Sequence, residues 1–385
     1  MEARPHFNFR DVLRAPAAAL SAKQILVMSL ALLAALVVYD IFTYAALFAA
    51  GEPMYQAFDA YGLAPLNNLL LDTMLAQVVY WAGVGLAVLV VMLGFFAVSA
   101  FNIEAIRGNR FMSPGQAIRF AIRRLPQIFF SELSIVLFVA LIVLLFAALG
   151  LVSRIPIIGE WLYVLLFAIP NFIIALFAIF IIFVLSLTVL LLPAVAAAER
   201  RGETFTAILE TFSTIILQPF RWFGYTVYSL VAAKVCGFIY AYFAYRAVQF
   251  LIWSASLGGG ERLGRLGQSG VAHLPVRSDL MRETFSLFPG VPFGVDLRPL
   301  IGYPTDSTLS HIMAFMLFLI FLSILGYTLA IVAAGQARGY VALRFIKDNY
   351  SIAAEDSLFF KDEPVNEPVD PEEARASLTD KPENR

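Results

Sequence analysis

The sequence predicts an all-α integral membrane protein with six transmembrane helices, arranged as three hairpins that are each preceded by a cytoplasmic interfacial amphipathic helix. Three observations lead to this prediction. Hydrophobic residues make up 60% of the 385 residues and charged residues only 14%, whereas a soluble domain typically carries about 25% charged residues. Six apolar runs are long enough to cross a bilayer. A short segment of similar character precedes every second run.

The composition also excludes several classes of protein. Too few polar residues are present to cover a globular surface, which excludes a soluble enzyme and a nucleic-acid-binding protein. Cys236 is the only cysteine, so no intrachain disulfide can form and a disulfide-stapled secreted domain is excluded. The three histidines, His6, His273 and His311, are scattered along the chain, so we expect no metal site and no cofactor.

The spans follow from the length of each apolar run, because about 20 residues are needed to cross a hydrocarbon core of about 30 Å. The fourth run, residues 161–198, is too long for one simple span, and Pro170 divides it. We assign the span to 171–192 and interpret 161–169 as either a kinked extension or a re-entrant piece. The predicted spans are residues 25–50, 73–101, 129–152, 171–192, 222–253 and 311–335.

The distribution of positive charge predicts that both termini are cytoplasmic. The loop between the second and third spans carries five arginines, whereas residues 51–72 contain no lysine or arginine. The outer loop, residues 254–310, carries five arginines, but charges count less in loops of about 60 residues. We therefore expect a cytoplasmic amphipathic segment at 1–24, a transmembrane domain at 25–345 and an acidic cytoplasmic tail at 346–385, whose composition predicts disorder. A bacterial cytoplasmic (inner) membrane is the expected location.

Three short segments, residues 9–24, 113–127 and 203–219, precede the first, third and fifth spans. In the second segment, apolar residues fall on one helical side, while Arg119, Arg123 and Arg124 lie mostly on the other. This pattern is typical of a helix in the membrane interface, with arginines that reach anionic headgroups. Ser113 is the expected N-cap of that helix. The similarity of the three segments reflects either internal duplication or the same selection acting at each membrane elbow.

Some of these residues resemble a known group of proteins. They are residues 155–159 (IPIIG), the pair Leu192-Pro193 followed by Glu199, and residues 207–219. They are similar to bacterial six-span proteins that include the membrane domain accompanying some glycerophosphodiester phosphodiesterases, together with uncharacterised relatives. The resemblance covers about residues 102–243 and implies architecture, not activity, because no soluble stretch here is long enough to contain the phosphodiesterase domain.

Two ionisable residues lie well inside predicted spans, where burial in lipid is costly. Asp40 lies about 22 Å and Lys234 about 18 Å from the cytoplasmic ends of their spans, at a helical rise of about 1.5 Å per residue. A lysine side chain could reach across that offset. The two residues therefore form either an ion pair that ties the first hairpin to the third, or a proton- or substrate-linked site at mid-membrane. A third alternative is that each residue faces water or the membrane surface independently.

Small residues predict close helix packing in the last span. They recur at four-residue spacing, and the final pair forms a GxxxG motif. In contrast, the outer loop 254–310 shows little helical periodicity, and we expect the glycine run at 258–260 to be a hinge with no helix directly after it. The packing residues are Gly326, Ala330, Ala334, Gly335 and Gly339.

The motifs that mark hydrolases and phosphate-binding enzymes are missing from the sequence, so we expect no catalytic residues and no enzymatic activity. Two functions remain. The first is a non-catalytic membrane protein that organises or stabilises a larger assembly through the outer loop 254–310 or the acidic tail. The second is a transporter for a lipid-like or other apolar substrate, with Asp40 as the candidate proton carrier. The expected partners are the lipid bilayer and other membrane subunits, and no nucleic acid.

Overall fold

The structure is a computed structural model that describes residues 6–61, 65, 69, 71–151, 154–156, 158–164, 168–200, 202–259, 261–274 and 308–359. Every regular element in these ranges is a helix, as the sequence predicts. Five of the helices are long and apolar enough to cross a membrane, and the bent helix α9 makes a sixth if its two arms count as one span. The chain is therefore an all-α protein with the helices of a multi-pass integral membrane protein.

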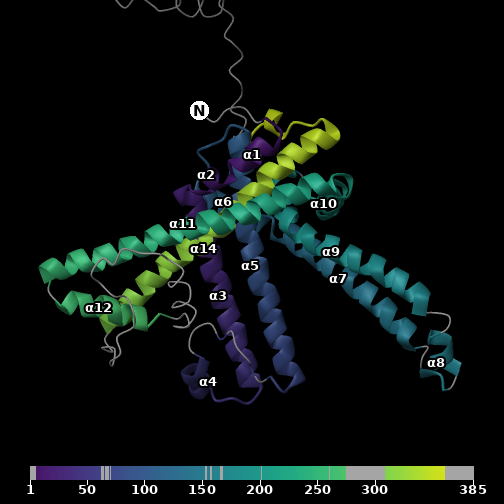
Figure 1. Ribbon diagram of the computed structural model, residues 1–385, viewed down its shortest axis with the longest axis horizontal. Helices are drawn as coiled ribbons and strands as arrows, with labels where there is room; N and C mark the ends of the chain where they lie inside the picture. Colours follow the sequence, from purple (N-terminus) through teal and green to yellow (C-terminus); the bar gives the residue numbers. More distant parts are fainter. Residues whose placement is uncertain are drawn as a thin grey trace, which may run out of the picture.

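The long helices pair with their neighbours along the chain, α3 with α5, α7 with α9 and α11 with α14. The three pairs point in different directions from a shared base, where the short helices α1, α2, α6 and α10 gather (Figure 1). The long helices are α3 (Ala22–Ala49), α5 (Met74–Ile106), α7 (Leu125–Leu151), α9 (Ala168–Ala198), α11 (Pro219–Gly259) and α14 (Thr308–Asp348). The short helices are α1 (Phe9–Leu13), α2 (Ala15–Ala19), α4 (Met54–Tyr61), α6 (Pro114–Arg123), α8 (Ile158–Leu162), α10 (Thr204–Leu217), α12 (Glu261–Ala272) and the 3-10 turn η3 (Ile352–Ala354).

The base is built from three helical segments that are buried on every side, and we call them together the hub. They are residues 94–104 of α5, 191–198 of α9 and 330–343 of α14. The three helices contact one another pairwise. Alanine and glycine are frequent in all three segments, most clearly in 194–198 (AVAAA), and small side chains let helix backbones approach closely. The hub thus forms a dense core from which the three hairpins extend.

Helix α6 starts where the sequence predicts. The Ser113 side chain accepts a hydrogen bond from the Gln116 amide at 3.2 Å, and the Gln116 side chain accepts one from the Ser113 amide at 2.8 Å. This reciprocal capping satisfies two backbone donors that a helix start otherwise leaves unpaired. On the apolar side of α6, Ala117 and Ala121 are buried in the hydrophobic core, so part of this side packs on the protein. The Phe120 ring also lies 5.2 Å from the Phe96 ring of α5.

Helix α10 has apolar residues on two sides. Ala207 and Ile215 are buried in the core, while Phe205 and Leu217 are 70% and 65% exposed. One side of α10 therefore packs on the protein and the other faces its surroundings. Helices α1 and α2 also pack on the protein, because Val12, Ala15 and Ala19 are completely buried.

The fourth long helix contains a bend that the sequence does not predict. Pro170 is helical and lies close to residues 165–167, which are outside the described residues, so the break predicted at this proline is not tested. The bend is one of 45° between Ile169–Phe183 and Thr188–Ala198. The hydroxyls of Ser186 and Thr188 donate to backbone carbonyls of the preceding turn, a pattern that bends helices.

The third hairpin also departs from expectation after residue 260. Helix α12 follows directly and packs on α11 and α14. A Cβ atom added to Gly267 would lie 2.8 Å from Ile252 Cδ1, and one added to Gly270 would lie 2.6 Å from Met313 Cγ. Gly267 and Gly270 therefore permit the close packing of α12 on α11 and α14, although glycine weakens the helical pattern in the sequence. The predicted docking loop at 275–307 lies outside the described residues.

The last long helix and the chain after it are more ordered than predicted. Helix α14 runs to Asp348, well beyond the expected end of the span at 335. Residues 349–359 then return to the hub, and Ile352 is 1% exposed. The remaining predicted tail, 360–385, lies outside the described residues. The acidic tail of the sequence prediction therefore begins with a packed segment.

We predict that Gly326→Leu destabilises the protein by overpacking the contact between α14 and α3, a change that typically costs about 1–3 kcal/mol. A Cβ at this position would lie 2.3 Å from Ser29 Oγ and 3.1 Å from the Ile25 carbonyl oxygen. The measurement is the thermal unfolding midpoint in detergent micelles. Gly85→Leu is the matched control, because nothing lies within 4 Å of a Cβ at that helical glycine. Equal midpoints for the two variants would contradict the predicted contact.

Candidate functional site

A buried ion pair lies at the end of α5, just beyond the hub. The Arg107 Nη1 atom lies 3.1 Å from Glu104 Oε1, and the two side chains are 0% and 2% exposed. Arg107 Nη2 also donates to the Ala198 carbonyl oxygen at 2.9 Å. A buried guanidinium is stable only when charged and polar partners surround it. Arg107 thereby fixes the end of α9 against the end of α5.

Residues 349–359, which we call the clasp, complete this polar cluster. Glu355 forms ion pairs with Arg107 and with Arg200, the latter at 3.2 Å. The Ser357 hydroxyl donates to Glu104 and accepts a hydrogen bond from Asn109 Nδ2 at 3.0 Å. The clasp thus supplies partners to both members of the buried pair, and it joins the chain after α14 to the ends of α5 and α9.

A second polar connection crosses the hub itself. Asn102 Nδ2 donates to Gln24 Oε1 at 3.1 Å, and Arg338 Nε donates to Asn102 Oδ1 at 3.2 Å. These bonds join α3, α5 and α14 inside the hydrophobic core. Because an unpaired polar group in such a place costs about 1–3 kcal/mol, the bonds favour one arrangement of the three helices over others.

Similar bonds attach α11 to α14. Gln336 Oε1 accepts a hydrogen bond from Trp222 Nε1 at 3.3 Å, and Gln336 Nε2 donates to Thr226 Oγ1 at 3.0 Å. Helix α10 is fixed to the end of α14 by an ion pair between Lys347 Nζ and Glu210 Oε1 at 2.6 Å. All three hairpins are therefore joined at the base through side-chain hydrogen bonds.

The turn between α9 and α10 depends on Glu199 and Gly202. The Glu199 carboxylate accepts hydrogen bonds from the backbone amides of Gly202 and Glu203. Gly202 has a φ of +76°, which disfavours any side chain. A Cβ there would also overlap Arg124, whose Nη2 atom donates to the Arg200 carbonyl at 2.6 Å. Arg124 is thus part of the base, whereas Arg119 and Arg123 are exposed on α6.

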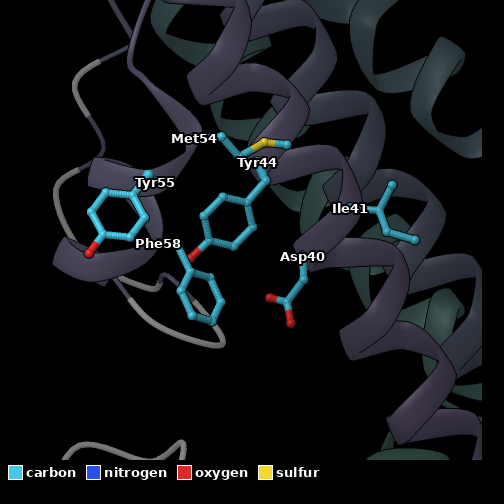
Figure 2. A pocket seen from close by; sticks show the side chains of 6 residues that line it. All are labelled: Asp40, Ile41, Tyr44, Met54, Tyr55 and Phe58. Atoms are coloured by element: carbon cyan, nitrogen blue, oxygen red, sulfur yellow. The ribbon is translucent and has the colours of Figure 1, made fainter.

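The structure does not bring Asp40 and Lys234 together. Asp40 lies on α3 and lines a pocket against α4, as Figure 2 shows. Lys234 is exposed on α11, in a different hairpin, and within the part of the chain that the structure describes no ion pair joins it to Asp40. The α3–α5 and α11–α14 pairs point in different directions from the hub (Figure 1), so residues on these two hairpins do not come together by depth alone.

The predicted packing residues of the last span lie on the buried part of α14. Gly326 faces α3, as its contacts with Ser29 and Ile25 show, and Gly335 faces Ser229 of α11. Gly339 lies in ordinary van der Waals contact with Tyr225, also on α11. Ala330 and Ala334 are completely buried. These small residues allow α14 to lie between the first hairpin and α11.

The sequence analysis does not single out Glu104, Arg107 or Glu355, because Glu104 and Arg107 fall in a predicted loop and Glu355 falls in the predicted tail. One signal was available. Glu104 and Arg107 are three residues apart at the end of an apolar helix, a spacing that places them on one helical side. Within the described residues no group of three or more metal-ligating side chains is present. The site can hold helices in place, and its groups are arranged for ion pairing.

Comparison with known proteins found no matching family model, no similar curated protein and no similar solved structure.

Burial by itself would raise the pKa of Glu355, but the hydrogen bond from Tyr350 and the charge of Arg107 hold this pKa below its ordinary value. The Tyr350 hydroxyl donates to Glu355 Oε1 at 2.6 Å. The same hydrogen bond raises the pKa of Tyr350. Glu355 is therefore charged at neutral pH and suited to its two arginine partners.

We predict that Arg107→Met strongly destabilises the protein, because it leaves Glu104 buried without its cation, a loss of about 3–5 kcal/mol. The matched control is Arg200→Met, which also removes a partner of Glu355. The Arg200 side chain is 47% exposed, and an exposed pair contributes about 0–1 kcal/mol. Chemical denaturation in detergent micelles measures both. A loss for Arg107→Met no larger than that for Arg200→Met would show that the buried pair does not hold the base together.

We predict a second, pH-dependent effect from Glu355. Its pKa is lower in the folded protein than in the unfolded chain, where it is about 4.3. The charged form therefore stabilises the folded state at every pH above that value, and the contribution disappears as the pH falls through the folded pKa. The unfolding midpoint of the wild type should exceed that of Glu355→Gln by a constant amount from about pH 8 to pH 5.5, and the difference should close below about pH 4. A difference that grows on acidification contradicts this assignment.

Proposed function

We propose that the protein is a non-catalytic membrane protein that organises or stabilises a larger membrane assembly. In this proposal all six long helices cross a bacterial inner membrane, and the hub lies on its cytoplasmic side. The hairpins then extend through the bilayer as three arms, with the base holding them at fixed angles.

The observation that carries the proposal is the exposure of the α7–α9 hairpin. The consecutive residues Val136, Leu137 and Phe138 of α7 are 62%, 59% and 48% exposed. Successive residues in an α-helix point about 100° apart, so three in a row cover most of the helix circumference. On α9, Phe172 and Ile173 are likewise 66% and 53% exposed. The outer part of this hairpin contacts little of the protein beyond its own partner helix.

Apolar surface of this extent has to be covered by lipid or by another protein. Helices within one membrane protein commonly pack against each other along their length, and here the arms instead diverge from a polar, densely bonded base (Figure 1). The base uses hydrogen bonds and buried charge to hold the divergence. Divergent arms leave sides of each hairpin available for helices of partner proteins, which favours an organising role.

A transporter of a lipid-like substrate is the second candidate. The pocket beside Asp40 favours it, because a carboxylate there adjoins the apolar and aromatic side chains of Ile41, Met54 and Phe58. An apolar substrate would not require a polar path through the spans. If Asp40 carries protons for transport, Asp40→Asn abolishes transport of the substrate without unfolding the protein.

We predict that the exposed sides of the second hairpin contact specific partner proteins. A photo-crosslinking amino acid at Leu144 of α7 or at Phe180 of α9, which are 64% and 62% exposed, should form adducts with defined membrane proteins in native membranes. Mild-detergent extraction followed by mass spectrometry of the adducts identifies them. The matched control is Phe111, 93% exposed near the base, where the proposal expects no adduct with the same proteins. Adducts with lipid alone at Leu144 and Phe180 would contradict the organising role and favour the transporter.

A further inference from the structure

The pocket beside Asp40 combines one carboxylate with aromatic and apolar walls. It lies between α3 and α4, has a volume of about 590 Å³ and is lined by Asp40, Ile41, Tyr44, Met54, Tyr55 and Phe58. This volume is in the range of small-molecule sites. The Tyr44 and Phe58 rings lie 6.0 Å apart. Figure 2 shows the Asp40 carboxylate beside these two rings, on the side of α3 that faces α4.

In the proposed membrane orientation, the pocket lies on the half of α3 farther from the hub, nearer the opposite membrane surface. Asp40 follows the first residue of α3 by 18 positions, which corresponds to about 27 Å at a rise of about 1.5 Å per residue. The hydrocarbon core is about 30 Å thick. Aromatic residues surround the same level, with ring distances of 6.2 Å for Tyr39–Tyr80 and 5.5 Å for Tyr80–Trp81. Tyrosine and tryptophan gather at the headgroup level of bilayers.

The charge of this hairpin is complementary to a cation. Residues 24–106 contain no lysine, arginine or histidine. Several carboxylates lie in the half of the hairpin farther from the hub. Among the side chains that the structure describes, these are Asp40, Glu52 and Asp72. The potential around the pocket is therefore negative, which attracts positively charged groups and repels anionic ones.

The chemistry of the lining identifies the kind of cation. A carboxylate forms charge-assisted hydrogen bonds with an ammonium group, and the faces of Tyr and Phe rings attract cations within about 6 Å. The apolar side chains of Ile41 and Met54 suit hydrocarbon. A molecule with an ammonium group at one end and acyl chains at the other matches both features at this depth. We propose that the pocket binds the ammonium headgroup of an aminophospholipid. This inference rests on the proposed crossing of the membrane by α3, but it does not depend on the organising role.

The test compares lipids on the full-length wild-type protein. Native mass spectrometry of the delipidated chain in detergent measures binding of dioleoyl-phosphatidylethanolamine, of its N-acetylated form, which lacks the positive charge, and of dioleoyl-phosphatidylglycerol. The proposal expects about tenfold tighter binding of phosphatidylethanolamine than of either other lipid, which corresponds to about 1.4 kcal/mol. Equal binding of phosphatidylethanolamine and its N-acetylated form would overturn it, whatever any variant does.

Two substitutions locate the site. Asp40→Asn should reduce the lipid preference to within about twofold, and Phe58→Leu, which keeps an apolar side chain but removes the aromatic face, should reduce it severalfold. The matched control is Asp72→Asn, which removes the same charge from an exposed position on the same hairpin and should leave the preference unchanged. If Asp40→Asn and Asp72→Asn reduced the preference for phosphatidylethanolamine equally, the preference would come from the overall negative charge of the hairpin, and the assignment to the pocket would be overturned. Binding of soluble glycerophosphoethanolamine as tight as that of the lipid would overturn the assignment to a lipid.

Discussion

The guanidinium of Arg107 contacts three separate parts of the chain, namely Glu104 on its own helix, the carbonyl of Ala198 at the end of α9, and Glu355 of the clasp. Its burial is possible only if all three are present, because an uncompensated buried charge is strongly destabilising. The constraint therefore couples the ends of α5, α9 and α14. Burial of Arg107 also requires that the helices pack closely enough to exclude water. The small residues of the hub allow this close approach of the helix backbones.

The molecule therefore has a densely bonded base and three hairpins that extend from it with fewer supporting contacts. Polar bonds at the base fix the direction in which each hairpin leaves, as the connections Gln24–Asn102–Arg338 and Trp222–Gln336 illustrate. Beyond the hub, α3 and α5 support each other closely, since a Cβ on Gly83 would lie 2.2 Å from Phe42 Cβ. The α7–α9 hairpin lacks comparable support along its outer part. Local stability follows the density of buried contacts, so this hairpin depends most on what surrounds it.

The long helices could be predicted from sequence because hydrophobic length is a local property, and the start of α6 could be predicted because Ser113, Pro114 and Gln116 form a local cap. The base could not. The partners of Arg107 come from α5, α9 and residue 355, and nothing local indicates that these segments meet. Helix α12, within the predicted outer loop 254–310, could not be predicted from the sequence. Gly267 and Gly270 weaken its helix propensity, although they permit its close packing. Helical arithmetic predicts similar depths for Asp40 and Lys234, but a depth along each helix does not say in which direction each hairpin points.

Divergence of the hairpins within a bilayer is the central claim, and a distance measurement between two arms tests it most directly. Spin labels at Leu75 of α5 and Ile169 of α9, which are 63% and 75% exposed near the far ends of their hairpins, can be introduced after Cys236 is replaced by serine. Pulsed electron resonance in lipid nanodiscs then reports their separation. The account predicts a distance well beyond the roughly 8–10 Å that separates packed helix axes. A short distance typical of neighbouring helices would show that the arms close into one bundle, and the account of a divergent organising protein would fail.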